Sequence, residues 1–203
     1  SVKPLRVGRR LVIRPSWESA SLLPGDLDII LDPKQAFGTG HHATTRMLLE
    51  WLEELIHGGE TVLDVGSGSG ILAMAALRLG ARSAVGVEID PVAVDCAQEC
   101  ASQNAFGAEL TLICGTLSDV TAGMRPDLVV ANIDRQTLLL LADELAAYGV
   151  AGSRLFFSGL LVEQVEEVMA PYAAVGLYPV HRREQDGWVA LELSRSEPCE
   201  GQE

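Results

Sequence analysis

From residue 61 onward, short apolar runs rich in β-branched residues alternate with longer segments that carry apolar residues at helical spacing. This alternation is typical of βαβ units, in which parallel strands are joined by helices that pack on both faces of the sheet. The runs are almost continuously apolar, as strands covered on both faces should be. The pattern therefore predicts an α/β fold with a doubly wound, mostly parallel sheet.

Seven strands are expected in this sheet, and the last two form a hairpin. Gln185-Asp186-Gly187 separates the final two apolar runs, and Asp-Gly between such runs is a hairpin signal. We therefore expect an antiparallel C-terminal hairpin on the parallel sheet. The predicted strands are 61–65, 84–88, 110–113, 128–131, 155–157, 177–184 and 188–193, and the predicted helices between them are 71–79, 91–104, 137–147 and 162–172.

The residues ahead of the sheet carry further structural signals. Residues 42–56 hold apolar side chains at helical spacing, which predicts an amphipathic helix packed on the sheet. Residues 11–13 and 28–31 are predicted as short strands. A chain of 203 residues is long enough for one sizeable domain. We interpret residues 1–194 as that domain and the polar residues 195–203 as a disordered tail.

The composition favours a protein partner over nucleic acid. A formal net charge of −13 opposes binding to a phosphate backbone, which depends on Lys and Arg, and it favours a basic protein substrate. Apolar stretches end well before the roughly eighteen residues that cross a bilayer, and the basic residues 1–10 lead into no apolar signal segment. We therefore expect a cytoplasmic protein without a membrane span. The cysteines are expected to be reduced thiols.

Glycines alternate at 66, 68 and 70, directly after the first strand of the predicted sheet. Glycine lets the backbone approach a ligand closely at the carboxyl end of a strand. The dinucleotide fingerprint Gly-x-Gly-x-x-Gly would need glycine at position 71, where this chain has Ile71. The segment Asp64-Val65-Gly66-Ser67-Gly68-Ser69-Gly70 is instead similar to the turn that binds S-adenosylmethionine, which is the cofactor we expect.

Glu88 ends the next predicted strand, at the distance where an acidic residue reaches ribose hydroxyls in such folds. Asp90 precedes Pro91 and is predicted to cap the following helix. A tight strand-to-helix turn without ligand is the alternative interpretation of the glycines. The joint presence of Asp64, the glycines and Glu88 favours a cofactor site.

The segment Phe37-Gly38-Thr39-Gly40-His41-His42-Ala43-Thr44-Thr45 precedes the predicted amphipathic helix. Thr44 or Thr45 could cap that helix, and the segment could also fold over a bound cofactor. The adjacent histidines have no companion ligands at metal-binding spacing, so no metal site is expected.

The predicted strand 128–131 runs into Asn132 and Ile133. The Asn132 carboxamide can donate and accept hydrogen bonds, so it could orient a neutral amine. Asparagine at a strand end is also a common turn former, which is the alternative interpretation.

Together these segments resemble the PrmA-type ribosomal protein methyltransferases, which trimethylate amino groups of a large-subunit ribosomal protein. The resemblance implies a class I, Rossmann-like methyltransferase fold and methyl transfer from S-adenosylmethionine to lysine or α-amino groups. It is carried by residues 4–10, 15–17, 31–33, 36–45, 64–70, 131–133, 157–160 and 187–191.

The motifs and the resemblance together give the candidate site residues. Asn132 and Ile133 are the candidate catalytic residues. The candidate cofactor contacts are Phe37, Gly38, Thr39, Thr45, Asp64, Gly66, Gly68, Gly70, Glu88 and Asn132.

Three features depart from the family pattern. Glu88 stands where the family has aspartate, and Asp134-Arg135 stands where it usually has Leu-Ala. The family also carries an N-terminal substrate-recognition domain, whereas residues 1–10 already resemble the catalytic domain. We therefore expect this chain to bind the cofactor but to methylate a ribosomal protein poorly.

Two other functions fit part of the pattern. A nucleic-acid amino methyltransferase would use Asn132 at the start of an Asn-Pro-Pro-aromatic motif, but Ile133-Asp134-Arg135 replaces the rest of that motif. A cofactor-binding domain without catalytic activity is the non-enzyme alternative.

Overall fold

The computed structural model describes residues 3–35 and 42–195 and contains two sheets. The larger sheet has seven strands in the order β6-β5-β4-β7-β8-β10-β9. The first five of these are parallel, and β10 runs antiparallel to both β8 and β9. This confirms the mostly parallel seven-stranded sheet and its C-terminal hairpin. The strands are β4 (Thr61–Val65), β5 (Ser83–Glu88), β6 (Leu110–Cys114), β7 (Leu128–Asn132), β8 (Arg154–Leu161), β9 (Leu177–Gln185) and β10 (Trp188–Arg195).

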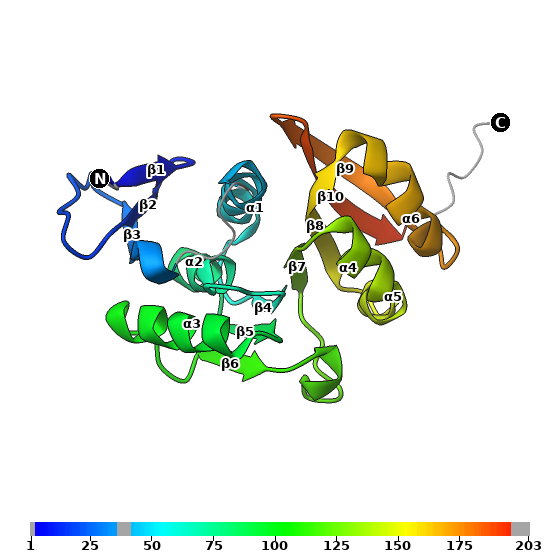
Figure 1. Cartoon of the computed structure of the whole chain (residues 1–203), viewed down its shortest axis with the longest axis horizontal. Coiled ribbons are helices and arrows are strands. Elements are labelled where there is room, and N and C mark those ends of the chain that lie inside the picture. The colour runs from blue at the N-terminus through cyan, green and yellow to red at the C-terminus, as the bar shows by residue number, and fades with distance from the viewer. Residues whose placement is uncertain (1–2, 36–41, 196–203) are drawn as a thin grey trace.

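Helices cover both faces of this sheet, α1 to α3 on one side and α4 to α6 on the other (Figure 1). Consecutive residues of a strand point to opposite faces, so each strand contributes to two cores. In β7, Val130 packs with α1 and α2, whereas Val129 packs with α4, α5 and α6. The helices are α1 (His42–Leu55), α2 (Ile71–Leu79), α3 (Pro91–Gln103), α4 (Arg135–Leu140), α5 (Ala142–Val150) and α6 (Val165–Ala173), with 3-10 turns at Pro33–Gln35, Leu117–Asp119 and Val162–Gln164.

A second, smaller sheet packs against α1 and α2 through Val7, Leu11 and Ile29. It consists of β1 (Leu5–Val7), β2 (Leu11–Arg14) and β3 (Leu27–Ile30). The predictions at 11–13 and 28–31 locate β2 and β3, but β1 was not predicted. Its three residues are too few to show a period, and it exists only by pairing with β2.

The predicted helix 137–147 differs from the structure, which has two helices, α4 and α5, separated at Leu141. The apolar run from Leu138 to Leu141 has no helical period that would reveal the break. The predicted helix 162–172 begins as a 3-10 turn before α6.

The structure also bears on the predictions for the cysteines, for membrane-spanning helices and for the C-terminal tail. Cys96, Cys100 and Cys114 are free thiols. Among the residues that the structure describes, no helix has the length and apolar character needed to cross a bilayer. Of the predicted tail 195–203, only Arg195, the last residue of β10, is described; 196–203 lie outside the described residues.

The sheet order places β4 at the point where the connections change direction, with β5 on one side and β7 on the other. In open α/β sheets, ligands bind outside the carboxyl ends of the strands at such a reversal. The glycine turn follows β4 and Asn132 ends β7. Both candidate motifs therefore flank the reversal point.

Candidate active site

The glycine turn joins β4 to α2 in a conformation that requires glycine. Gly66, Gly68 and Gly70 have φ values of 69°, 53° and 78°, in the left-handed region that disfavours side chains. The backbone N–H groups of Gly66 and Ser67 donate to the carbonyl of Val87, at 2.8 and 3.1 Å. These bonds fix the turn against the end of β5.

Ile133 explains why two positions near the turn must lack a side chain. A Cβ at Gly66 would lie 2.5 Å from Ile133 Cγ2, and a Cβ at Gly159 in β8 would lie 2.4 Å from the Ile133 carbonyl oxygen. The Ile133 N–H donates to the carbonyl of Ser158 at 3.1 Å. The segment after β7 is therefore held tightly between the glycine turn and β8.

Asp64 lies in β4 beneath the turn and is 1% exposed. Its Oδ2 accepts a hydrogen bond from the Ala73 N–H at 3.2 Å. Burial, reinforced by the negative charge of Glu88, raises the pKa of the Asp64 carboxyl to about 7 despite that hydrogen bond. Asp64 is thus a buried carboxyl that changes charge near neutral pH.

Glu88 connects the glycine turn to the start of α3. Its Oε1 accepts from the Gly68 N–H and its Oε2 accepts from the Asp90 N–H, both at 3.0 Å. These bonds hold the carboxylate in place and leave further lone pairs for a ligand. The Asp90 side chain accepts from the Val92 N–H with Pro91 at the first helical position, which confirms the predicted cap.

Asn132 and Thr45 meet although they are 87 positions apart in the sequence. Asn132 Nδ2 donates to Thr45 Oγ1 at 3.0 Å. A second bond, from Ser158 Oγ to the Thr44 carbonyl at 3.1 Å, ties the start of α1 to β8. Within the described part of the chain, the Asn132 carboxamide oxygen has no hydrogen-bond partner, so it is the free end of this side chain.

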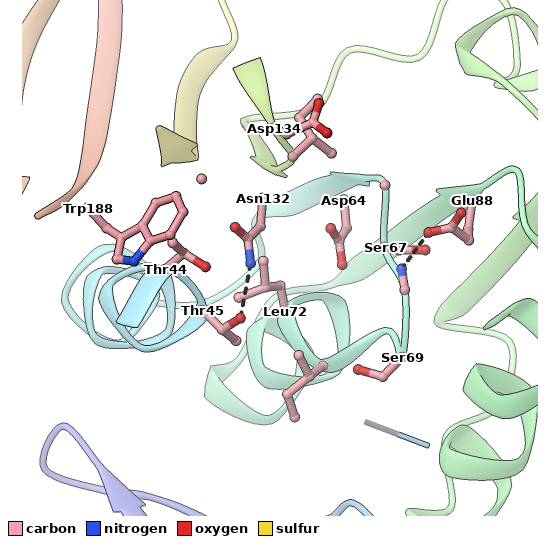
Figure 2. A pocket seen from close by; sticks show the side chains of 15 residues that line it. Thr44, Thr45, Asp64, Ser67, Ser69, Leu72, Glu88, Asn132, Asp134 and Trp188 are labelled. Carbon is pink, nitrogen blue, oxygen red and sulfur yellow. Dashed lines mark hydrogen bonds between the residues drawn. The ribbon is translucent and has the colours of Figure 1, made fainter. Parts of the chain in front are cut away.

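These elements enclose a cavity of about 300 Å³. In Figure 2, Glu88 lies at one end and Trp188 at the other, with Asp64 and Asn132 between them. The carboxyl groups of Asp64, Glu88 and Asp134 make the wall acidic, which suits a cationic ligand. The lining residues are Thr44, Thr45, Asp64, Gly66, Ser67, Gly68, Ser69, Ile71, Leu72, Glu88, Asn132, Ile133, Asp134, Gly159 and Trp188.

Most of the predicted site residues come together here. The structure brings Thr45, Asp64, Gly66, Gly68, Glu88, Asn132 and Ile133 to the wall of one cavity.

Gly70 does not line the cavity; it is the N-cap of α2, and a Cβ there would lie 3.0 Å from Met74 Cε. Phe37, Gly38 and Thr39 lie outside the described residues. Among the described residues, no cluster of three or more His, Cys, Asp or Glu side chains could hold a metal ion.

Among the lining residues that the site prediction missed, Gly159 and Trp188 come from strands β8 and β10. Trp188 begins β10 and pairs with Leu161 at the end of β8, which brings the indole to the cavity. Both residues lie in segments that resemble the PrmA family, so the resemblance was an available signal. No local pattern predicts their approach to the glycine turn.

Comparison with known proteins gives a consistent result. A family model described as ribosomal protein L11 methyltransferase (PrmA) matches residues 1–196. A protein of that name from Symbiobacterium thermophilum is 46% identical over 189 residues, which cover 93% of this chain and 61% of the relative. One from Geobacter metallireducens is 46% identical over 188 residues, with the same two coverages. The chain thus spans about 61% of the length of these curated relatives.

Solved structures resemble the fold closely. The crystal structure of a ribosomal protein L11 methylase from Lactobacillus delbrueckii subsp. bulgaricus has a TM-score of 0.87 and 32% identity, and the match covers 97% of this chain and 100% of that one. A putative RNA methyltransferase from Pyrococcus horikoshii, with 22% identity, a TM-score of 0.63 and coverage of 82% and 88%, shares the fold. As its motifs predicted, the chain belongs to the family described as ribosomal protein L11 methyltransferase (PrmA).

Proposed function

We propose that residues 1–194 form the catalytic domain of an S-adenosylmethionine-dependent N-methyltransferase that acts on amino groups of a basic protein. The relatives' printed name points to ribosomal protein L11 as the substrate, and such a substrate favours a cytoplasmic location. The observation that carries the proposal is that one acidic cavity joins the glycine turn, Glu88 and the Asn132–Thr45 pair.

The cavity walls fit the cofactor's parts. The turn residues Gly66 and Gly68 allow close backbone approach, and the fixed Glu88 carboxylate can accept from ribose hydroxyls. The Asp64 carboxyl lies near the middle of the cavity, where a cationic centre would favour its ionised form. The cofactor supplies an electrophilic methyl group on a positively charged sulfur.

The acceptor amine must be neutral to act as a nucleophile. For a lysine with a pKa of about 10.4, losing the proton at pH 7 costs roughly 4 to 5 kcal/mol, and a partly dry cavity lowers that cost by disfavouring the ammonium. Because Thr45 holds the Asn132 amide nitrogen, the Asn132 oxygen can accept an N–H of the amine and direct the lone pair toward the methyl group. Catalysis then depends on positioning the reacting atoms in line.

The test separates cofactor binding from acceptor choice. Calorimetry with S-adenosylhomocysteine should show saturable binding to the 203-residue chain. The chain should then be incubated at high concentration with radiolabelled S-adenosylmethionine and either ribosomal protein L11 or ribosomal RNA. Label in the protein supports the proposal, and an Asn132→Ala control should lose it. Label in the RNA alone, or no binding of S-adenosylhomocysteine, would overturn it.

A further inference from the structure

A second cavity of about 260 Å³ adjoins the proposed cofactor site. Asp134, Gly159 and Trp188 line both cavities, so the two spaces meet at these residues. The second cavity is formed by the start of α4, the end of β8 and the start of β10. Its remaining lining residues are Arg135, Gln136, Leu161 and Gln164.

Asp134 brings an anionic group to this junction. Its Oδ1 accepts a hydrogen bond from the Thr137 N–H at 2.8 Å. Hydrogen bonding to Thr137 holds the pKa of Asp134 below its usual value, so the side chain stays charged at neutral pH. The Thr137 side chain also hydrogen-bonds to this carboxylate, and within the described residues no basic side chain pairs with Asp134. A carboxylate has about four lone-pair sites, so Asp134 can still accept a hydrogen bond from a ligand.

Arg135 does not cancel this charge. Its guanidinium forms a two-pronged ion pair with the Glu167 carboxylate of α6, with Nε to Oε2 at 2.8 Å. The charge of Arg135 is thus paired with a carboxylate that lines neither cavity. The charge that remains at the junction is that of Asp134.

We infer that the second cavity admits the acceptor, and that Asp134 selects an amine that is cationic in solution over an uncharged acceptor. This inference rests on the proposed function, because it assumes that the first cavity holds the cofactor. Trp188 would form the opposite wall at the junction, where an aromatic surface can contact the carbon chain that carries the amine.

Asp134 also suits the charge movement of the reaction. The bound amine would first lose a proton to solvent, because only its neutral form is a nucleophile. The new N–C bond would then form as the S–C bond breaks, and the positive charge would move from sulfur to nitrogen. A carboxylate beside the nitrogen stabilises that charge as it develops. Because Asp134 is a weak base, its contribution is electrostatic, and the proton of the product ammonium leaves to solvent.

Binding measurements can test this without catalysis. The probes are two analogues of the cofactor in which nitrogen replaces the sulfur. In place of the methyl group, one analogue carries a 3-aminopropyl group and the other carries an uncharged butyl group of similar size. The parent chain should bind the aminopropyl analogue roughly tenfold more tightly by calorimetry, which is the scale of one charge-assisted hydrogen bond. Asp134→Asn keeps a good helix cap and should abolish this preference.

Two controls separate the explanations. Glu166 is exposed on α6 and lines neither cavity. Glu166→Gln removes one negative charge there and should keep the tenfold preference for the aminopropyl analogue. S-adenosylhomocysteine should bind the parent and the Asp134→Asn variant with the same Kd within about twofold. Equal binding of the two analogues by the parent, or a preference that survives Asp134→Asn, would overturn the inference alone. Failure of all three ligands to bind the parent would overturn the proposed function and this inference with it.

Discussion

Replacing Asp64 with asparagine is expected to stabilise the folded protein at alkaline pH. Asp64 is 1% exposed, and burial raises its pKa from 3.8 to about 7. Between these values the folded protein keeps a proton that the unfolded chain has lost, so the free energy of unfolding falls as pH rises through this window. Above pH 7 the full pKa difference corresponds to a loss of about 4 kcal/mol in the free energy of unfolding.

Asparagine isolates this effect. Its side-chain oxygen can keep the hydrogen bond from the Ala73 N–H, and its volume is similar, but it cannot ionise. The stability of the variant relative to the parent should therefore increase by about 2 kcal/mol between pH 5.5 and pH 8, the part of the window that this range covers.

Urea unfolding at the two pH values, followed by circular dichroism, measures this difference when the m-values of parent and variant agree. Asp95→Asn, on an exposed position of α3, is the matched control and should change stability equally at both pH values. If the Asp64→Asn difference were the same at pH 5.5 and pH 8, or smaller at pH 8, the argument from burial would be refuted.

Three further predictions concern the cavity. Asn132→Ala should lower kcat at least about tenfold with a smaller change in the Kd for the cofactor. Thr45→Val removes the hydrogen-bond partner of the Asn132 amide nitrogen and should reproduce part of the loss in kcat. Equal losses in kcat and in cofactor affinity would contradict a role of Asn132 in orienting the acceptor. Glu88→Ala should weaken S-adenosylhomocysteine binding about tenfold or more by calorimetry, and an unchanged Kd would remove it from the site. Gly159→Ala and Gly152→Ala both place a side chain at φ 110°, but only the first would set a Cβ 2.4 Å from a backbone oxygen. Thermal unfolding should therefore show an extra loss of about 1 to 3 kcal/mol at Gly159, and equal losses would argue against the close contact.

Much of the fold could be predicted because its signals are local. The alternation of apolar runs and helical periods after residue 61 predicts parallel strands with helices between them, and Asp186-Gly187 predicts the final hairpin. The Asp90-Pro91 helix start is equally local, since the cap and the first turn are neighbours in the chain. The glycine turn combines such local information with a family resemblance that the comparisons confirmed.

The sequence by itself therefore determined the alternation of strands and helices after residue 61, the glycine turn, and the identity of the family. Only the tertiary structure decided which side chains meet: Asn132 with Thr45, Ile133 between two glycines, and Trp188 beside the same cavity. The break between α4 and α5 and the pairing of β1 were likewise settled by packing. Periodicity and turn chemistry depend on neighbouring residues, whereas these contacts depend on strands that are distant in sequence and adjacent in the sheet, so no short segment encodes them.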